Sequence, residues 1–592
     1  RSVCGTAGDG TESEPVEITT DPVHTPAKYA KKIAENAKVI TQGCESQGAP
    51  TIFKIPLIQE SVASGCRYRS FSFGKKSGMV QQHKVIMVVG ATGVGKSTLI
   101  NGMINYIIGV DWKDGFRFKI VDQEGEGTQS QAHSQTQIIS SYTIYRNKHH
   151  KVPYTLTIID TPGFGDTRGI ERDRAIVDQI RDFFSHSDTH KVDHIDAIGF
   201  VAQSSQARLT HTQRYVFDSI LSVFGKDISP NILLLVTFCD GQKPPVIEAV
   251  KAAEIPCSNS TFKFNNSALF ASTKSTSTRS VGRGKSYSDA DDDMTDNFDK
   301  MFWRMGMQSM WNFFVALDSL ESRSLSLTKE VLEERKRLET AVEGLQPQIQ
   351  MGVCKLEELR NEQQILEQHE TEIQANKSFE YEVEVPKSKM IPITDFITNC
   401  SKCHYSCHHP CGIADDNEKN GCWAMDGSGN CRICPGKCIW NIHFNQAYKF
   451  EYYSEKETRT YAELEERYKD ATGKKLTVEQ VIKKHYEEFL NVQKCVFVLI
   501  TNSHHSLKRL EEIALKPNPL STVEYVDLLI ESERTEAKPG WKSRLKALED
   551  IRKQADILVK VKQANFDPFE SYKKEFLGKQ TDKQGRSWYH FW

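Results

Sequence analysis

One stretch of the chain has the residue types and spacing of a phosphate-binding loop. It reads Gly-Ala-Thr-Gly-Val-Gly-Lys-Ser over residues 90–97 and follows the apolar run 85–89. Glycines let backbone N–H groups turn toward phosphate oxygens, and the N-terminus of a following helix adds positive potential. We expect Lys96 to reach the β and γ phosphates and Ser97 to hold Mg²⁺. The nucleotide-binding candidates in this loop are Gly90, Ala91, Thr92, Gly93, Val94, Gly95, Lys96, Ser97 and Thr98.

A second motif, Asp160-Thr-Pro-Gly163, follows at a distance that suits the same site. Asp160 ends the apolar run 156–159, where its carboxylate can hold Mg²⁺ through water, and the Gly163 N–H can sense the γ phosphate. Thr136 lies just before an expected strand and is the candidate first-switch threonine, with Thr128 as the alternative. We therefore predict catalytic roles for Lys96 and Thr136, and Mg²⁺ ligation by Ser97, Thr136 and Asp160.

A candidate for recognition of the base follows the third apolar run, residues 232–236. The sequence there continues as Thr237-Phe238-Cys239-Asp240. A carboxylate at Asp240 can accept hydrogen bonds from N1–H and the exocyclic amine of guanine, a pair of donors that adenine does not present. The motif therefore favours GTP and GDP over ATP, with Thr237 and Asp240 as nucleotide-binding residues.

Eight of the 15 cysteines lie between residues 400 and 438, a clustering that indicates metal binding. Thiolates at such spacings can surround tetrahedral Zn²⁺ and close loops that have no core of their own. Eight cysteines match two four-coordinate structural sites, and a histidine could replace one ligand. Four disulfides and an iron–sulfur cluster are the alternatives. The candidate ligands are Cys400, Cys403, Cys407, Cys411, Cys422, Cys431, Cys434 and Cys438, with His404, His408 and His443 nearby.

The elements that must position the nucleotide motifs alternate between strand-like and helical patterns over residues 82–275. This alternation predicts a doubly wound α/β domain. We expect helices over Asp173–Phe184 and Thr210–Phe224. The expected strands, besides the one before the loop, are Tyr142–Tyr145, Leu156–Ile159, Ala197–Val201, Ile232–Val236 and Ala268–Ala271.

These motifs together resemble a TRAFAC-class P-loop GTPase of the septin and GIMAP (immunity-associated GTPase) branch. The resemblance implies a Ras-like fold, GTP with Mg²⁺, and switch regions after Gly115 and Gly163. It also implies GTP-dependent dimers or filaments formed through the G domain, and places Asn266 and Ser267 beside the base. The supporting stretches are 90–97, 160–166, Ala207-Arg208-Leu209-Thr210, 237–240 and Phe264-Asn265-Asn266.

Two departures from the family pattern bear on activity. The usual base motif Asn-Lys-x-Asp has Phe238 where the lysine stem would cover the base, so we expect lower affinity. Phe164 stands where Ras-like enzymes have a water-orienting glutamine, and it cannot take that role. We therefore expect slow hydrolysis, or hydrolysis completed by a residue of a partner, with His133, His211 and Arg208 as candidates.

A heptad pattern begins after the α/β domain, with apolar residues at 331, 338, 345, 359, 366 and 373 and again at 342, 349 and 356. Such a register predicts a coiled coil, and the alternative is a long surface helix packed on the globular part. A second register begins at Tyr461. Strands are expected over Phe379–Val385 and Tyr448–Tyr453. The order of helix, strand, cysteines, strand and helix predicts a helical hairpin with a metal-bound tip.

Composition limits the other classes of function. The net charge of −2 gives no case for nucleic acid, and no apolar run is long enough to span a membrane. Cysteine usage favours a reducing, cytoplasmic location. Residues 1–22 resemble the last strand of a fibronectin type III domain, with an ordinary tail as the alternative. Since the chain begins at Arg1, we expect residues upstream of it.

We therefore predict a nucleotide-dependent switch whose helical arm and zinc module contact protein partners, with a GTP-bound scaffold that does not hydrolyse GTP as the alternative. The expected order is 1–22 fibronectin-like end, 23–81 lead-in, 82–275 G domain, 276–296 disordered linker, 297–324 packing helix, 325–378 coiled-coil helix, 379–453 zinc module, 454–518 returning helices and 519–592 C-terminal helices.

Overall fold

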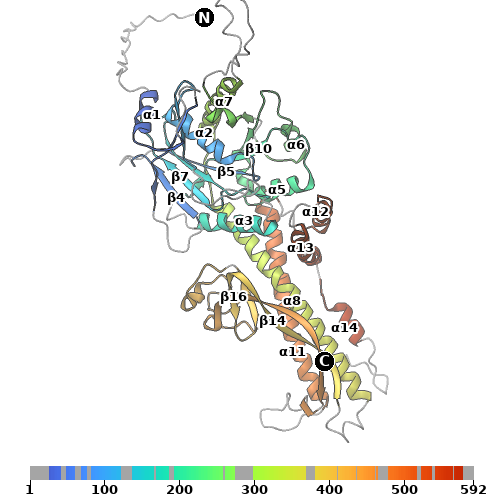
Figure 1. Ribbon diagram of the computed structural model, residues 1–592. Coiled ribbons are helices and arrows are strands. Elements are labelled where there is room, and N and C mark those ends of the chain that lie inside the picture. The colour runs from blue at the N-terminus through green and yellow to red at the C-terminus, as the bar shows by residue number, and fades with distance from the viewer. Residues whose placement is uncertain are drawn as a thin grey trace, which may run out of the picture.

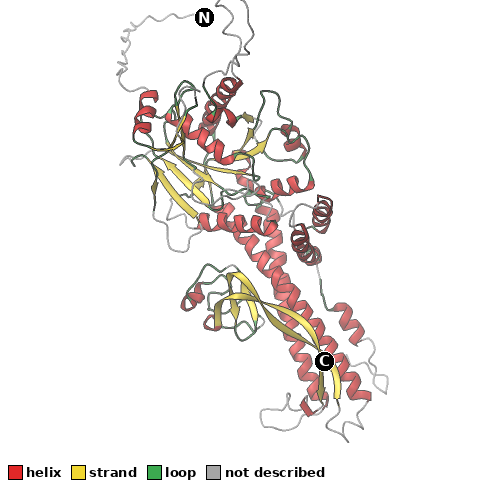
Figure 2. Cartoon of the chain, viewed as in Figure 1, coloured by secondary structure: helices red, strands yellow, loops and turns green. Residues whose placement is uncertain are grey.

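The chain folds into an α/β domain from which a long helical arm extends (Figures 1 and 2). This computed structural model describes residues 26–41, 49–60, 68–76, 82–121, 136–165, 169–185, 192–257, 261–273, 298–368, 380–409, 411–434, 436–460, 462–463, 478–516, 522–536, 541–563 and 566–577. No helix within these ranges is long and apolar enough to cross a membrane. The predicted linker 276–296 and the fibronectin-like segment 1–22 lie outside the described residues.

An eight-stranded sheet forms the centre of the α/β domain, in the order β12-β11-β10-β5-β8-β7-β4-β3. The strands from β12 to β8 are parallel to their neighbours, and β7 pairs antiparallel with β8. Continuous apolar runs form the central strands because both faces of this sheet are covered. The bounds are β3 Ile58–Gln59, β4 Tyr68–Phe73, β5 His83–Gly90, β7 Ile139–Ile144, β8 Thr155–Asp160, β10 Ala197–Gln203, β11 Ile232–Thr237 and β12 Thr261–Lys263.

Two apolar clusters lie on opposite faces of the sheet. On one face, α2 and α7 bury residues such as Met103, Ile104 and Phe313, so the aromatic-rich helix α7 packs on the α/β domain. On the other face, α3 and α5 bury Phe183 and Phe217. The helices of this domain are α1 Pro26–Glu35, α2 Lys96–Ile108, α3 Ile170–Ser185, α5 His211–Leu221, η2 Lys226–Asn231, α6 Val246–Ala252, η3 Asn266–Phe270 and α7 Phe298–Ser319.

The edges of the domain differ from the sequence-based prediction. Residues Ala268–Ala271 were expected to form a strand, but this apolar run lies in and just after the 3₁₀ helix η3, and the edge strand is β12. The lead-in segment adds β3 and β4 to the sheet, and a smaller sheet pairs β1 (Lys38–Thr41), β2 (Thr51–Lys54) and β6 (Phe116–Lys119).

The arm consists of two antiparallel helices, α8 (Ser326–Gln368) and α11 (Val478–Ile513). Their pairing follows from cross-helix bonds at both ends: Arg509 contacts Glu330, and His485 contacts Glu358 at 3.2 Å. The heptad residues of α8 that are buried against α11 include Val331, Leu338, Val342, Leu345, Leu356 and Leu359. We expected the returning helix to begin near residue 454, but residues 454–460 belong to a strand.

The base of the arm is tied directly to the α/β domain. Arg335 of α8 is half-buried and donates from Nε to the Ser222 carbonyl at 2.7 Å and from Nη2 to the Lys516 carbonyl at 3.1 Å. The Leu515 N–H, just past α11, donates to the Phe224 carbonyl at 2.9 Å. Outgoing and returning helices are therefore both anchored to the end of α5.

The cysteine-rich segment does not lie at the tip of the arm, as the order of elements had suggested. Strands β14 (Glu380–Cys400) and β16 (His443–Thr460) pair antiparallel and run back along α8 toward the α/β domain (Figure 1). The Tyr405 hydroxyl, on the short strand β15 (Tyr405–His408), donates to the Gly344 carbonyl in the middle of α8 at 2.9 Å. The cysteine module, residues 398–445, is therefore held beside the arm.

The C-terminal helices return to the α/β domain. Helices α12 (Val523–Glu536) and α13 (Trp541–Val561) bury Val526, Ile530 and Ile551 in the same cluster as α3 and α5. The Tyr525 hydroxyl donates to the His211 carbonyl at 3.4 Å. A last helix, α14 (Glu570–Leu577), follows Phe569, which packs against Phe489 of the arm.

Candidate functional site

The phosphate-binding loop lies between β5 and α2, as predicted. Gly93 and Gly95 have φ of +79° and +85°, values that residues with a Cβ rarely adopt. A Cβ on Gly90 would lie 2.6 Å from the Val201 carbonyl oxygen of β10. The glycine pattern of the loop therefore has two physical origins, backbone conformation and close approach to the neighbouring strand.

Lys96 begins α2 and is buried beneath the loop. Its Nζ donates to the Gly90 carbonyl at 3.1 Å and to the Ala91 carbonyl at 2.9 Å. Burial lowers the pKa of its ammonium to about 8, against the opposing effect of Asp160. Loop carbonyls thus hold the ammonium in the position from which a phosphate oxygen would be reached.

Three oxygen-bearing side chains converge beside Lys96. The Ser97 Oγ lies 3.3 Å from the Thr136 Oγ1. Both carboxylate oxygens of Asp160 are buried, and neither has a hydrogen-bond partner of normal geometry within the described residues. Burial raises the pKa of Asp160 to about 6, while Lys96 and the two hydroxyls act to lower it. A buried carboxylate beside two hydroxyls fits Mg²⁺, which prefers oxygen ligands. The competitor Thr128 lies outside the described residues.

Replacement of Thr136 by alanine should weaken Mg²⁺-dependent GTP binding about tenfold, since one hydroxyl contact to a charged group contributes about 1.5 kcal/mol. Titration of GTP at several Mg²⁺ concentrations measures this change. Thr136→Ser, which keeps the hydroxyl, is the matched control and should bind like the parent. If Thr128→Ala produced the loss and Thr136→Ala did not, the assignment of the first-switch threonine would be wrong.

The second motif packs directly against the phosphate loop. The Thr92 N–H donates to the Phe164 carbonyl at 2.8 Å, and its hydroxyl donates to the Gly163 carbonyl at 3.0 Å. A Cβ on Gly163 would lie 2.6 Å from the Thr92 Cα, so only glycine fits there. The Phe164 side chain is fully buried in the core below. It therefore does not point toward a water beside the γ phosphate.

The base-binding side combines two loops. The Thr237 hydroxyl donates to the Val94 carbonyl at 2.7 Å, a hydrogen bond that joins this loop to the phosphate loop. Exposed Asp240 accepts from the Gln242 N–H at 2.9 Å. The Asn265 amide donates to the Cys239 carbonyl at 2.9 Å, and its oxygen accepts from the Ser267 hydroxyl at 2.7 Å. Asn265 joins the two loops, a role that the sequence analysis did not assign to it. Asn266 and Ser267 begin η3 beside it.

Phe238, the residue in place of the lysine, has an unusual conformation. Its φ is +55°, and its ring is 52% exposed although it is large and apolar. The ring lies 3.7 Å from the position that a Cβ on Gly95 would take, so it stands beside the phosphate loop. A left-handed backbone at a bulky residue is rare and is found most often where function requires it. An exposed aromatic ring in this position can stack on a base bound beside the loop.

Phe238→Ala should therefore weaken GTP binding by about tenfold, because stacking of one base on an aromatic ring contributes roughly 1–3 kcal/mol. Phe238→Tyr keeps the ring and should bind like the parent. Phe298→Ala is a control for the loss of an exposed phenylalanine elsewhere on the domain. Equal affinities of the Phe238→Ala variant and the parent, measured by titration with GTP, would exclude a stacking role.

Two of the three candidates for a supplementary catalytic group, Arg208 and His211, lie within the described residues. Arg208 and His211 are exposed around the start of α5, and the His211 carbonyl accepts from Tyr525. His133 lies outside the described residues. A group that orients water is therefore not identified within the described residues of this chain.

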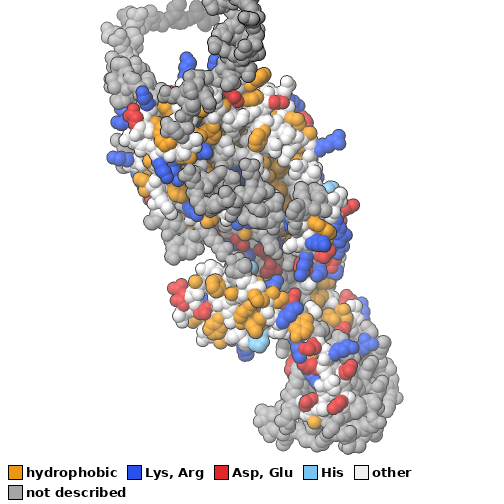
Figure 3. Space-filling view, in the orientation of Figure 1, with side chains coloured by type: hydrophobic (Ala, Val, Ile, Leu, Met, Phe, Trp, Pro, Cys, Tyr) orange, Lys and Arg blue, Asp and Glu red, His pale blue; other side chains and the backbone are white. Residues whose placement is uncertain are grey.

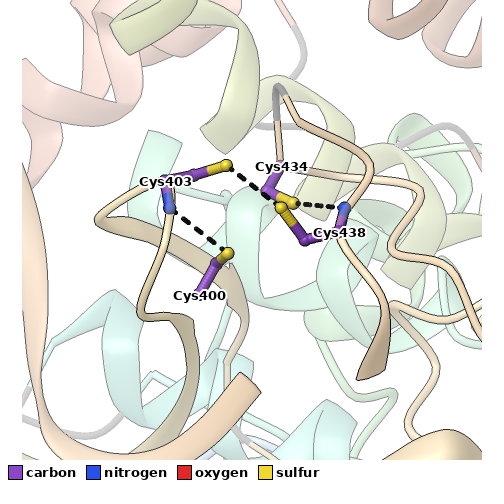
Figure 4. A group of neighbouring side chains, drawn as sticks. All are labelled: Cys400, Cys403, Cys434 and Cys438. Carbon is purple, nitrogen blue, oxygen red and sulfur yellow. Dashed lines mark hydrogen bonds between the residues drawn. The ribbon is translucent and has the colours of Figure 1, made fainter. Parts of the chain in front are cut away.

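The cysteine module brings all eight predicted cysteines into three groups of ligand atoms. The first is Cys400, Cys403, Cys434 and Cys438, drawn in Figure 4. The second is Cys407, Cys431, Cys434 and His443, and the third is His408, Cys411 and Cys422. Within each group all ligand atoms lie within 4.8 Å of one another. Among the histidines predicted as substitutes, His404 lies outside the groups and stacks on Phe450.

Two sulfur–sulfur distances in these groups are close to the separation expected between ligands of one tetrahedral zinc ion. Tetrahedral Zn²⁺ with Zn–S bonds of about 2.3 Å separates its sulfurs by roughly 3.8 Å. The Sγ atoms of Cys403 and Cys438 are 3.5 Å apart, and those of Cys411 and Cys422 are 3.8 Å apart. No disulfide joins the cysteines within the described ranges. The ligand set of thiolates and imidazoles fits Zn²⁺.

Backbone groups around the sulfurs also favour thiolates. The Cys431 Sγ accepts from the N–H groups of Ile433 and Cys434, each at 3.4 Å. The Cys434 Sγ accepts from the Cys438 N–H at 3.3 Å (Figure 4). A Cβ on Gly436 would lie 2.9 Å from the sulfurs of both Cys403 and Cys438, so the chain leaves room for the first group by omitting a side chain.

Comparison with known proteins supports the resemblance drawn from the motifs. Residues 82–189 match the family model described as Septin. The predicted resemblance to the septin branch of P-loop GTPases is therefore confirmed for this segment. No curated protein sequence matches the chain. The fibronectin-like end stays a prediction.

Several solved structures are similar to part of the chain. Toc33 from Arabidopsis thaliana in complex with Mg²⁺ and GMPPNP is 17% identical, with 41% of this chain and 88% of that chain covered and a TM-score of 0.24. A second structure comes from work on dimerization and the GTPase activity of the chloroplast translocon components atToc33 and psToc159. It is 15% identical, with 39% of this chain and 84% of that chain covered and a TM-score of 0.23. A probable GTP-binding protein engB is 18% identical, with 31% and 89% covered and a TM-score of 0.19.

Proposed function

We propose that this protein binds GTP with Mg²⁺ and hydrolyses it slowly, or only in a dimer or higher oligomer, and that the nucleotide state controls self-association or partner binding. The observation that carries the proposal is the convergence of Ser97, Thr136 and Asp160 beside the buried ammonium of Lys96. These groups would bind the metal and the phosphates. Lys96 would balance the charge that develops on the γ phosphate during transfer.

Asp240 supports guanine as the base. Asp240 is exposed on the loop after Thr237, and this loop is hydrogen-bonded to Asn265 through the Cys239 carbonyl. One carboxylate oxygen of Asp240 accepts from the Gln242 N–H, so the other oxygen can face a nucleotide. A test is direct: the parent should bind GTP in preference to ATP, and Asp240→Ala should lose this preference. A variant that kept the preference would show that another group reads the base.

Phe164 supports a slow intrinsic rate. Because its ring is apolar and fully buried, the position that holds a water-orienting glutamine in Ras-like enzymes contributes no polar side chain. We propose that a second copy of the chain, docked through the G domain, or another partner supplies this function. The GTP-bound scaffold without turnover is the second candidate, and the same observation favours it.

The contacts of α3 support control of the arm by the nucleotide. A cavity of about 130 Å³ lies where the second switch meets the arm, bordered by Phe164 and Asp173 on one side and by Arg335 and Leu338 of α8 on another. Ile551 of α13 also borders it. A shift of the segment after Gly163 would therefore change the packing of α8 and α13, because they share this boundary.

We further propose that the cysteine module binds zinc as a structural element and that the arm and module contact protein partners in a reducing, cytoplasmic environment. Exposed apolar side chains support the partner-binding part: Ile439 and Phe444 lie on this module, and Phe396 lies just before it. Figure 3 shows hydrophobic side chains gathered on the visible face of the module. Large exposed apolar groups are typical of docking surfaces.

The experiment that tests the proposal is phosphate release from GTP and from ATP over a wide range of protein concentration. GTP-specific release whose rate per chain rises with concentration would support a GTPase activated by self-association. Tight GTP binding with a flat, negligible rate would favour the scaffold. Failure to bind GTP would contradict both.

A further inference from the structure

The grouping of ligand atoms in the cysteine module does not divide eight cysteines into two sites of four. Cys434 belongs to two groups at once, and Cys411 and Cys422 stand in a third with His408. We propose that the module holds three zinc ions: a pair bridged by the Cys434 thiolate, and a separate ion held by His408, Cys411 and Cys422. This inference rests on the proposed zinc-binding role of the module and specifies its composition.

The bridged pair follows from the number of ligands. Two tetrahedral ions require eight ligand positions, and the first two groups together contain seven residues. Both ions become four-coordinate only if one residue serves both, and Cys434 is the residue common to the two groups. A thiolate has several lone pairs and can bridge, whereas an imidazole nitrogen has one.

His443 is prepared to bind the second ion of the pair. Its Nδ1 lies 3.0 Å from the Ile439 carbonyl, and its Nε2 lies 3.8 Å from the Cys434 Sγ. A hydrogen bond from Nδ1–H to a carbonyl places the free lone pair on Nε2, the form that binds zinc. His443 is fully buried and opposes Cys400 in the β14–β16 ladder, so it cannot turn away to solvent.

The third site shares no residue with the other two groups, and the ammonium of Lys419 lies beside it. The His408 Nδ1 is 3.2 Å from the Cys422 Sγ. Lys419 is fully buried, and its Nζ donates to the Cys411 Sγ at 3.5 Å and to the Ile413 carbonyl. A buried ammonium requires an anion, and the Cys411 thiolate is the anion within reach. Three ligands leave a fourth position, which we assign to water because the group contains no further His, Cys, Asp or Glu within the described residues.

Metal analysis of the full chain, purified under reducing conditions with zinc supplied, tests the number of ions. Zinc per chain is measured by elemental analysis against quantitative amino-acid analysis, and we expect three. Two would overturn this inference while leaving a zinc-binding module. None would overturn the proposed zinc-binding role as well, so the two failures are distinguishable.

Substitution of zinc by ¹¹³Cd²⁺ tests the bridge in the unaltered chain. We expect three cadmium resonances, two of which are split by mutual coupling through the shared sulfur. Three unsplit resonances would overturn the bridging role of Cys434. This measurement requires no variant, so it does not depend on whether a cysteine replacement folds.

Cys422→Ser tests the separateness of the third site. We expect this variant to keep two ions and the coupled pair of cadmium resonances. Loss of the coupled pair in Cys422→Ser would contradict an independent site. Cys257→Ser, which removes a cysteine outside the three groups, is the matched control and should keep three ions.

Discussion

Lys96→Ala should lower the affinity for GTP by roughly 100-fold, the largest effect expected from a single change at the nucleotide site. Removal of one member of a close, desolvated charge pair costs about 2–5 kcal/mol, and a loss of about 3 kcal/mol corresponds to this factor. The ammonium is buried, and within the described residues its hydrogen bonds go to the Gly90 and Ala91 carbonyls. Phosphate oxygens would give it the anionic partner that these carbonyls do not.

Equilibrium titration with a fluorescent GTP analogue measures this loss, and thermal unfolding without nucleotide provides the control for folding. The melting temperature of the variant should not fall. Burial lowers the pKa of the Lys96 ammonium, so the charged side chain is unfavourable in the folded state and its replacement removes this cost. Lys113→Ala removes an exposed lysine from the same domain and should bind like the parent. A Lys96→Ala variant that binds GTP within about threefold of the parent would contradict the assigned role of the loop.

Removal of metal should unfold the cysteine module and leave the α/β domain folded. The buried cluster of the module consists mainly of cysteines, with few other apolar residues such as Tyr405, Met425 and Ile433. So small a core cannot offset the entropy of ordering the chain, whereas each structural zinc contributes about 10–16 kcal/mol of binding free energy. Without the ions, the thiols would lose the partners that hold the loops together.

Hydrogen exchange after treatment with a chelator under reducing conditions measures this effect. Amides between residues 398 and 445 should lose protection, while those of β5 and α2 should keep theirs, and added zinc should restore the first set. GTP affinity serves as the control and should change less than about twofold, because the P-loop shares no ligand with the module. Unchanged exchange in protein shown to be metal-free would exclude a structural role for the ions.

The parts of the fold that the sequence predicted are those encoded by local pattern. The strand before the phosphate loop, the loop and α2 follow from one continuous stretch, because apolar runs, glycines and a helix start act over short distances. The heptads of α8 likewise identified residues that are buried against α11, such as Leu338 and Leu345. Asp160 and Thr136 could be proposed because each borders an expected strand.

The parts that sequence reasoning missed depend on contacts between distant segments. The run Ala268–Ala271 is apolar because η3 packs on the α7 side of the sheet. A short buried strand would have the same apolar pattern, so the local sequence cannot distinguish the two. The cysteine module lies beside α8 because the paired strands β14 and β16 turn back, which the order of elements does not reveal. The return of α12 and α13 to the second-switch face also has no local signal.

The anchoring of both arm helices at the end of α5 has a mechanical consequence. If the arm were attached through one helix and a flexible joint, it could pivot about that joint. A small rotation within the G domain would then not be passed on to the arm. Here Arg335 on the way out and Leu515 on the way back are bonded to carbonyls two residues apart, at Ser222 and Phe224. Such a double attachment resists free pivoting and transmits torque, so the far end of the arm should sweep through a distance that grows with its length.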